Sequence, residues 1–228
     1  MKNKVVINQI NNVVLNNFIG ESKVDAKQKS CILINNQESN VQIINPEMLF
    51  LGLYRALEFL KYLKKRKKKL RVLFVNTNPL HKNLTKNIAF FCEKWFINGK
   101  WLGGTLTNWT KISKSIKKCA EFEWKWKKLL DKNKIGRFKK IKSSFSGFSK
   151  FNKSKELKKP HVLIVLNPNK NQSAIREANL CGIPIIGFVE TANLKDMKNV
   201  TYPIISNNGN HELMSFCLNW IARVIIKK

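Results

Sequence analysis

Apolar and polar positions follow one another along the chain in a way that predicts strands and helices in turn. Two short β-branched runs, Cys31–Ile34 and Val41–Ile44, flank a polar stretch and predict a β-hairpin near the N-terminus. Leucines then recur at every third or fourth position after Pro46, which predicts an amphipathic helix. That helix ends in a run of six cations, residues 64–69, which suit a helix C-terminus.

The next segment has the pattern of a strand, a helix and a second strand. Arg71–Asn76 is a continuous apolar run of strand length, typical of a parallel strand buried on both faces. Pro79 can begin a helix, and Trp95–Ile97 predicts the next short strand. The helix is expected to bury one face made of Leu84, Ile88, Phe91 and Cys92.

The last third of the chain repeats this alternation. The expected elements are strand Val162–Leu166, helix Ser173–Cys181 with Gly182 as its stop, strands Pro184–Val189 and Tyr202–Ile205, and helix Glu212–Ile226. Strands separated by helices imply a parallel sheet that is covered on both faces. The sequence therefore predicts a doubly wound, flavodoxin-like α/β fold.

The segment between the two halves differs in composition and predicts an insert. Residues 110–160 hold eighteen Lys and Arg against four acids, whereas residues 161–228 hold seven against four. Apolar residues at helical spacing after Ile112 predict that the insert begins as a long helix that projects from the sheet, and residues 132–159 are expected to be less ordered. The expected parts are an N-terminal extension with the β-hairpin (1–47), an α/β sandwich (48–109 and 160–228) and a basic helical insert (110–159).

The net charge indicates the class of partner. Lys and Arg number 43 against 14 Asp and Glu, a formal charge of +29. A compact fold with that charge repels itself unless a polyanion neutralises it, so nucleic acid is the expected partner. A membrane is not expected, because the apolar runs are far shorter than the ~18 residues that a spanning helix requires.

Residues that would carry catalysis or bind a metal form no recognisable pattern. The five cysteines are scattered without a CxxC pair, which favours reduced, mostly buried thiols. The three histidines lie in unrelated segments, and neither the Walker A loop nor GxGxxG occurs. We therefore expect no enzyme, no metal site, no cofactor and no small-molecule substrate.

The most informative stretch is FINGKWLGGTLTNW, residues 96–109, which has two open interpretations. As plain structure, Gly103 and Gly104 supply a turn with positive φ while Trp101 and Trp109 pack in the core. As an RNA contact, the nearby lysine and the backbone amides of the loop meet phosphates. An enzymatic phosphate loop does not fit, since no acid stands nearby to hold a metal.

This stretch resembles the signature segment of the S-two family of small ribosomal subunit proteins, in which a W-L-G-G-x-L-T-N-W/F string follows a short strand. Residues 166–191, LNPNKNQSAIREANLCGIPIIGFVET, resemble the same family's strand–helix–strand block. YPIISNN (202–208) and VQIINPE (41–47) resemble two further family segments in the expected order. The resemblance implies a structural protein of the small ribosomal subunit, which binds ribosomal RNA and neighbouring small-subunit proteins. It also implies that the basic insert is a coiled-coil-like helical hairpin.

The expected RNA contacts are of two kinds, those in the basic run that ends the first helix and those in or just after the signature loop. Four lysines after the loop are spaced to cover one side of a helix. Glu177 and Arg176 are expected instead to form ion pairs at the surface or on the flank of a helix. The full set of expected RNA-binding residues is Lys64, Lys65, Arg66, Lys67, Lys68, Lys69, Lys100, Trp101, Gly103, Gly104, Thr107, Asn108, Lys111, Lys114, Lys117 and Lys118.

Residue usage bears on the compartment. Lys, Asn, Ile and Phe are abundant whereas Ala, Gly and Arg are scarce, a bias common in organelle genomes poor in G and C. Residues 1–20 contain no Arg and do not resemble a mitochondrial presequence. We therefore expect a chain encoded and used inside the mitochondrion, with an AT-rich bacterium as the competing source. The functional alternatives are a nucleotide-binding enzyme on the same fold and a free RNA-binding protein.

Overall fold

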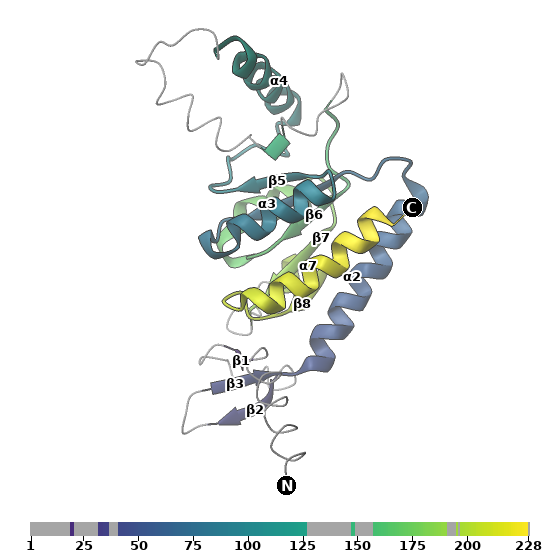
Figure 1. Cartoon of the computed structure of the whole chain (residues 1–228), viewed down its shortest axis with the longest axis vertical. Coiled ribbons are helices and arrows are strands. Elements are labelled where there is room, and N and C mark those ends of the chain that lie inside the picture. Colours follow the sequence, from purple (N-terminus) through teal and green to yellow (C-terminus); the bar gives the residue numbers. More distant parts are fainter. Residues whose placement is uncertain are drawn as a thin grey trace.

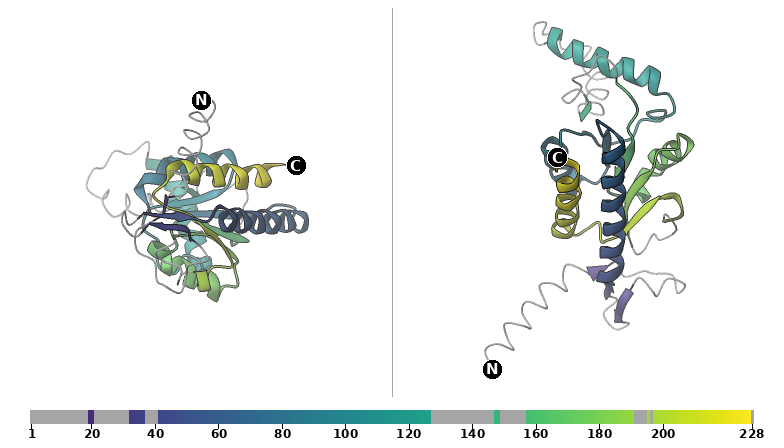
Figure 2. Two further views of the ribbon diagram at one scale, coloured as in Figure 1. Left: turned by 90° about the horizontal axis from the view of Figure 1, so that it is seen from below. Right: turned by 90° about the vertical axis from the view of Figure 1, so that its right-hand side faces the viewer.

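The protein is represented by a computed structural model that describes residues 19–20, 32–36, 41–126, 147–148, 157–190, 195 and 197–227. Its centre is one sheet with helices on both faces (Figure 1). A helix at one end of the molecule and a small second sheet at the other extend away from this centre (Figure 2).

The central sheet has five strands, all parallel to their neighbours. The strand order is β5-β4-β6-β7-β8, which is the flavodoxin-like order 2-1-3-4-5 and confirms the predicted parallel α/β sheet. Four of the strands are almost fully buried, as their continuous apolar runs predict. The strands are β4 (Val72–Asn76), β5 (Trp95–Asn98), β6 (Val162–Val165), β7 (Ile185–Val189) and β8 (Tyr202–Ile205).

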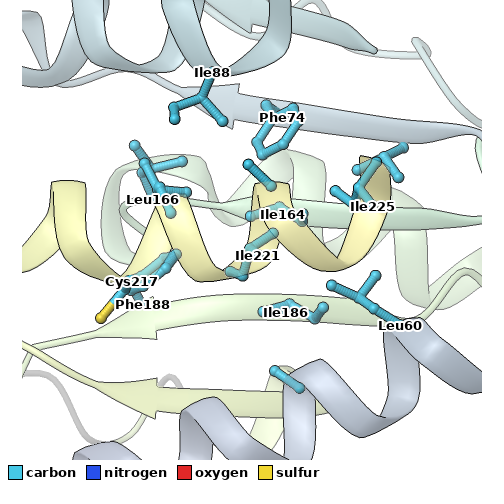
Figure 3. Packing of buried hydrophobic residues seen from close by; sticks show 14 of the residues in the cluster. Leu60, Phe74, Ile88, Ile164, Leu166, Ile186, Phe188, Cys217, Ile221 and Ile225 are labelled. Atoms are coloured by element: carbon cyan, nitrogen blue, oxygen red, sulfur yellow. The ribbon is translucent and has the colours of Figure 1, made fainter. Parts of the chain in front are cut away.

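Three helices cover one face of the sheet: α2 (Pro46–Arg66), α3 (Lys82–Phe91) and α7 (His211–Ile226). Their apolar stripes pack on alternate residues of the strands, among them Phe74, Ile164, Ile186 and Phe188 (Figure 3). Helix α2 begins where predicted, because the Asn45 side chain accepts a hydrogen bond from the Glu47 amide at 3.0 Å.

The opposite face is covered by α6 (Gln172–Leu180) and by the segment that follows β5. Ala174, Ile175 and Ala178 pack here with the remaining strand residues, such as Leu163. Gly182 ends this helix with a φ of 63°, as expected of a C-terminal glycine. Two short 3₁₀ turns, η2 (Pro79–His81) and η4 (Asn169–Asn171), connect β4 to α3 and β6 to α6.

The predicted buried face of α3 is wrong in one residue. Phe91 is 69% exposed, whereas Ile88 and Cys92 are buried as expected. The buried side of the helix is centred on Thr85 and Ala89, small residues that allow close packing on the sheet. Phe91 lies off that face.

The two outlying parts are described only in segments. Strands β1 (Ile19–Gly20), β2 (Ile32–Asn36) and β3 (Val41–Ile44) form an antiparallel sheet in the order β1-β3-β2. The polar turn expected at 35–40 lies mostly outside the described residues. In the insert, α4 (Trp109–Trp126) is described, while 127–146 and 149–156 lie outside the described residues.

Candidate nucleic-acid interface

The signature loop leaves the carboxyl end of β5 and leads into α4. Of the glycine pair Gly103 and Gly104, for which a turn with positive φ was predicted, only Gly104 has a positive φ, of 83°. Gly99, earlier in the loop, has a φ of 154°. Trp101 and Trp109 are buried, as the structural interpretation predicts. The Trp109 indole also donates to the Leu157 carbonyl at 2.7 Å, which ties the start of α4 to the end of the insert, just before β6.

A buried carboxylate holds this loop from the other side. Glu177, on α6 and 8% exposed, accepts hydrogen bonds at Oε1 from the Trp101 indole (2.9 Å) and the Gly104 amide (2.8 Å). Its Oε2 accepts from the amides of Leu106 (2.8 Å) and Thr107 (3.4 Å). The expectation that Glu177 forms an ion pair at the surface or on the flank of a helix is therefore wrong.

This network changes what the loop can offer to RNA. The amides of Gly104, Leu106 and Thr107 already donate to a carboxylate, so the expectation that such loop amides meet phosphates is not met for these three. The outward side of the loop consists of Lys100, Gly103, Thr107 and Asn108, all of them exposed. Trp101 faces inward and fixes the shape of the loop.

Helix α4 separates its apolar and basic residues. Ile116 is buried and Ile112 half-buried against the Trp109 end of the core. Lys111, Lys114 and Lys118 are exposed, and Lys117 is half-buried. The lysines therefore lie on the side of the helix away from the sheet, as the spacing predicts.

The basic run at the end of α2 lies at the other end of the strands. Residues 65–69 are exposed, but Lys64 is half-buried. The Lys64 ammonium donates to the carbonyls of Val224 (2.9 Å) and Ile225 (2.8 Å) and to that of Lys227, so it caps the end of α7. Burial lowers the pKa of Lys64.

The carboxyl edge of the sheet, where doubly wound folds bind nucleotides, is closed by its own polar side chains. Asn76 bonds to both backbone groups of Asn78, and the Asn171 amide donates to the Asn167 carbonyl at 2.6 Å and to Thr77. The hollow that remains beside Asn76 and Asn98 has a volume of about 160 Å³, below the ~300 Å³ at which small-molecule pockets begin.

The part of the chain that the structure describes has neither a cluster of metal ligands nor a membrane-spanning helix. Within those residues, no group of three or more His, Cys, Asp or Glu is arranged to hold a metal ion. No described helix is long and apolar enough to cross a membrane. Cys92 and Cys217 are buried thiols, and burial raises the pKa of each to about 12.

The family model described as Ribosomal protein S2 matches residues 15–228. The chain belongs to this family. It is 33% identical over 169 residues to small ribosomal subunit protein uS2 of Anaplasma marginale (strain St. Maries), across 69% of this chain and 48% of the relative. The uS2 protein of Wigglesworthia glossinidia brevipalpis is 33% identical over 198 residues, across 83% of this chain and 78% of the relative. The uS2 protein of Aeromonas salmonicida (strain A449) is 31% identical over 209 residues, across 88% of this chain and 82% of the relative.

The alignment with the Anaplasma marginale relative spans about half the length of that protein. Within this Ribosomal protein S2 chain, the signature loop and the strand–helix–strand block of residues 166–191 are in direct contact through Glu177. Sequence reasoning found both blocks but missed the residue that joins them. The available signal was an acid beside the apolar positions Ala174 and Ala178 in a chain with few acids.

Proposed function

We propose that the chain is a structural constituent of the small ribosomal subunit, where it binds ribosomal RNA and neighbouring small-subunit proteins and catalyses no reaction. The observation that carries the proposal is the family match over residues 15–228, together with relatives that are named as small ribosomal subunit proteins. The formal charge of +29 supports an RNA partner.

The proposed RNA contacts divide between two regions at opposite ends of β4 and β5. One region is the exposed side of the signature loop with the lysines of α4, and the other is the basic run at 65–69. Lysines in both regions would neutralise phosphates and release counterions, while the rigid loop fits RNA shape. Trp101 and Lys64 contribute by positioning, because one binds Glu177 and the other caps α7.

The mitochondrial setting is part of the proposal. It is supported by the bias toward Lys, Asn, Ile and Phe in the sequence. We also propose that β2 and β3 form a hairpin in the N-terminal extension, and that α4 is the first helix of a basic helical hairpin inserted at 110–159.

The location of the protein tests this function. In extracts of the source organism, the chain should sediment with small ribosomal subunits in stoichiometric amount through a high-salt wash. If the organism has mitochondria, those subunits should come from the mitochondrial fraction. Recovery of most of the chain in a ribosome-free soluble fraction would refute the function, and recovery with cytoplasmic bacterial ribosomes would refute the compartment alone.

The lysines of α4 provide a test of the RNA contact itself. Replacing Lys111, Lys114 and Lys118 with Gln should lower affinity for small-subunit rRNA. It should also flatten the plot of log affinity against log salt by roughly two units, taking ~0.7 to 0.9 per phosphate. A charge-matched control replaces three exposed lysines that lie outside both regions, Lys82, Lys170 and Lys198. Equal slopes for the two variants, measured by filter binding, would show that the α4 lysines are only a solvated face.

A further inference from the structure

The basic run at the end of α2 lines one wall of a hollow that residues far away in the sequence complete. Its volume is about 760 Å³, and nine of its twelve lining residues are Lys or Arg. Lys94, just before β5, and Lys227 at the end of α7 join Lys61 and residues 64–70 there. Leu70, Val224 and Ile225 give it an apolar floor. Figure 1 shows the ends of α2 and α7 side by side at this place.

The cations around this hollow repel one another, which destabilises their charged forms. Lys94 is half-buried, and burial is the main cause that lowers its pKa; Lys69 and Lys64 add to the effect, while Cys92 and Glu93 act in the opposite direction. Nearby, burial together with Arg71 and Lys67 lowers the pKa of His161 to about 4. None of the described residues that line the hollow is acidic, although Lys61 forms an ion pair with Glu58 at 2.6 Å, on the exposed side of α2. A bound anion would relieve this repulsion.

Helix ends account for only part of the cluster. Lys64 bonds to the last carbonyls of α7, and Lys65 and Arg66 lie in the last turn of α2, where cations are favourable. Lys67 is the C-cap residue of α2, whereas Lys68, Lys69 and Lys94 lie beyond that helix or just before β5. The last three cations therefore point to a ligand outside the chain.

We propose that this hollow binds consecutive phosphates of a single-stranded segment of ribosomal RNA, with a ribose or base against the apolar floor. The inference rests on the proposed function and adds Lys94 and Lys227 to the RNA-binding residues. The volume falls within the range of about 300 to 1,000 Å³ of pockets for small molecules, which suits one or two nucleotides and not a duplex. An apolar floor within a cationic rim matches a nucleotide better than a free phosphate.

The test uses the full chain and two RNA probes. One probe is a single strand of about ten uridines, within the site sizes of single-strand-binding folds, and the other is a duplex of equal charge. The hollow variant carries Lys68→Gln, Lys69→Gln and Lys94→Gln, and the control is the Lys82, Lys170 and Lys198 variant. The hollow variant should bind the single strand roughly tenfold more weakly and with a salt slope about two units smaller. The control variant should keep most of the affinity for the single strand and most of the salt slope.

Equal weakening by the two variants, or an equal loss of single-strand and duplex binding, would overturn the proposal.

A second measurement follows the melting temperature of the protein at low salt. The single strand should raise it more for the wild type than for the hollow variant, whereas an equal rise from tripolyphosphate at matched phosphate would overturn RNA as the ligand. A wild type that does not sediment with small subunits refutes the proposed function. If the wild type sediments with small subunits but the hollow variant binds RNA like the control variant, only the proposal about the hollow is refuted.

Discussion

At the scale of single residues, Glu177 has the most consequential environment. Its carboxylate lies beneath the signature loop and accepts hydrogen bonds from four donors on four different residues. Three of these donors are backbone amides, so the carboxylate acts on the path of the chain as well as on one side chain. Hydrogen bonds to a charged acceptor are stronger than those between neutral groups.

Replacing Glu177 with Gln should therefore destabilise the protein. One acceptor oxygen becomes an NH₂ group that faces N–H donors, which leaves buried donors unpaired at a cost of roughly 1–3 kcal/mol. Urea unfolding followed by tryptophan fluorescence measures the loss. The control is Arg176→Gln, an exposed neighbour on the same helix, for which we expect a change within about 0.5 kcal/mol. Equal stability of the two variants would contradict the anchoring role of the carboxylate.

Residue-level prediction from the sequence succeeded where burial follows from residue type. The tryptophans of the signature loop are in the core, as the structural interpretation predicts. Glu177 was missed because its partners lie 70 to 76 positions away along the chain, and the spacing of residues within a helix carries no information on such contacts. Lys94 was missed for the same reason, since only the fold brings it to the basic run.

At the scale of elements, Gly52 sets how closely α2 approaches the sheet. A Cβ at this position would lie 2.7 Å from the Pro203 carbonyl oxygen of β8 and 3.2 Å from the Ile204 Cα. Both are backbone atoms, so they cannot move aside as a flexible side chain would. The absence of a side chain lets the helix lie directly on the edge strand.

Changing Gly52 to Ala should lower the free energy of unfolding. Alanine gains about 1 kcal/mol of helix propensity, but overpacking against a backbone typically costs about 1–3 kcal/mol, and at 2.7 Å we expect the clash to prevail. Chemical unfolding measures the difference. Gly103→Ala is the control, because a Cβ there meets nothing within 4 Å. If the Gly52 variant is as stable as the wild type, relief of the clash by a shift of α2 costs no more than the ~1 kcal/mol gained in helix propensity.

Strands and long helices were the most predictable elements. The buried strands appear as unbroken apolar runs, and α2 has both an Asn–Pro start and a basic end. Helix α3 was harder, because Thr85 and Ala89 on its buried side are too weakly hydrophobic to reveal the face. Phe91 was wrongly included in the buried face, because a pattern of large apolar residues does not show where small residues pack.

At the scale of the whole molecule, charge is segregated across the fold. The cations of the signature loop and α4 follow the carboxyl end of β5, whereas the cationic hollow adjoins the start of β4. Residues 161–228, which supply three of the five strands, are nearly balanced in charge. The sheet therefore holds two cationic regions apart in fixed geometry, an arrangement that suits contact with two separate segments of one RNA.

The strand order also governs when this chain can fold as it is synthesised. β4 lies at the interior of the sheet, yet its partner β6 begins only at Val162, after the whole insert. At the ~5–20 residues per second of protein synthesis, several seconds pass between the emergence of the two strands. During that time the nascent chain presents an open apolar edge at Phe74 and Val75. A pause in translation within the insert would prolong this stage, in which the open strand edge can pair with another chain.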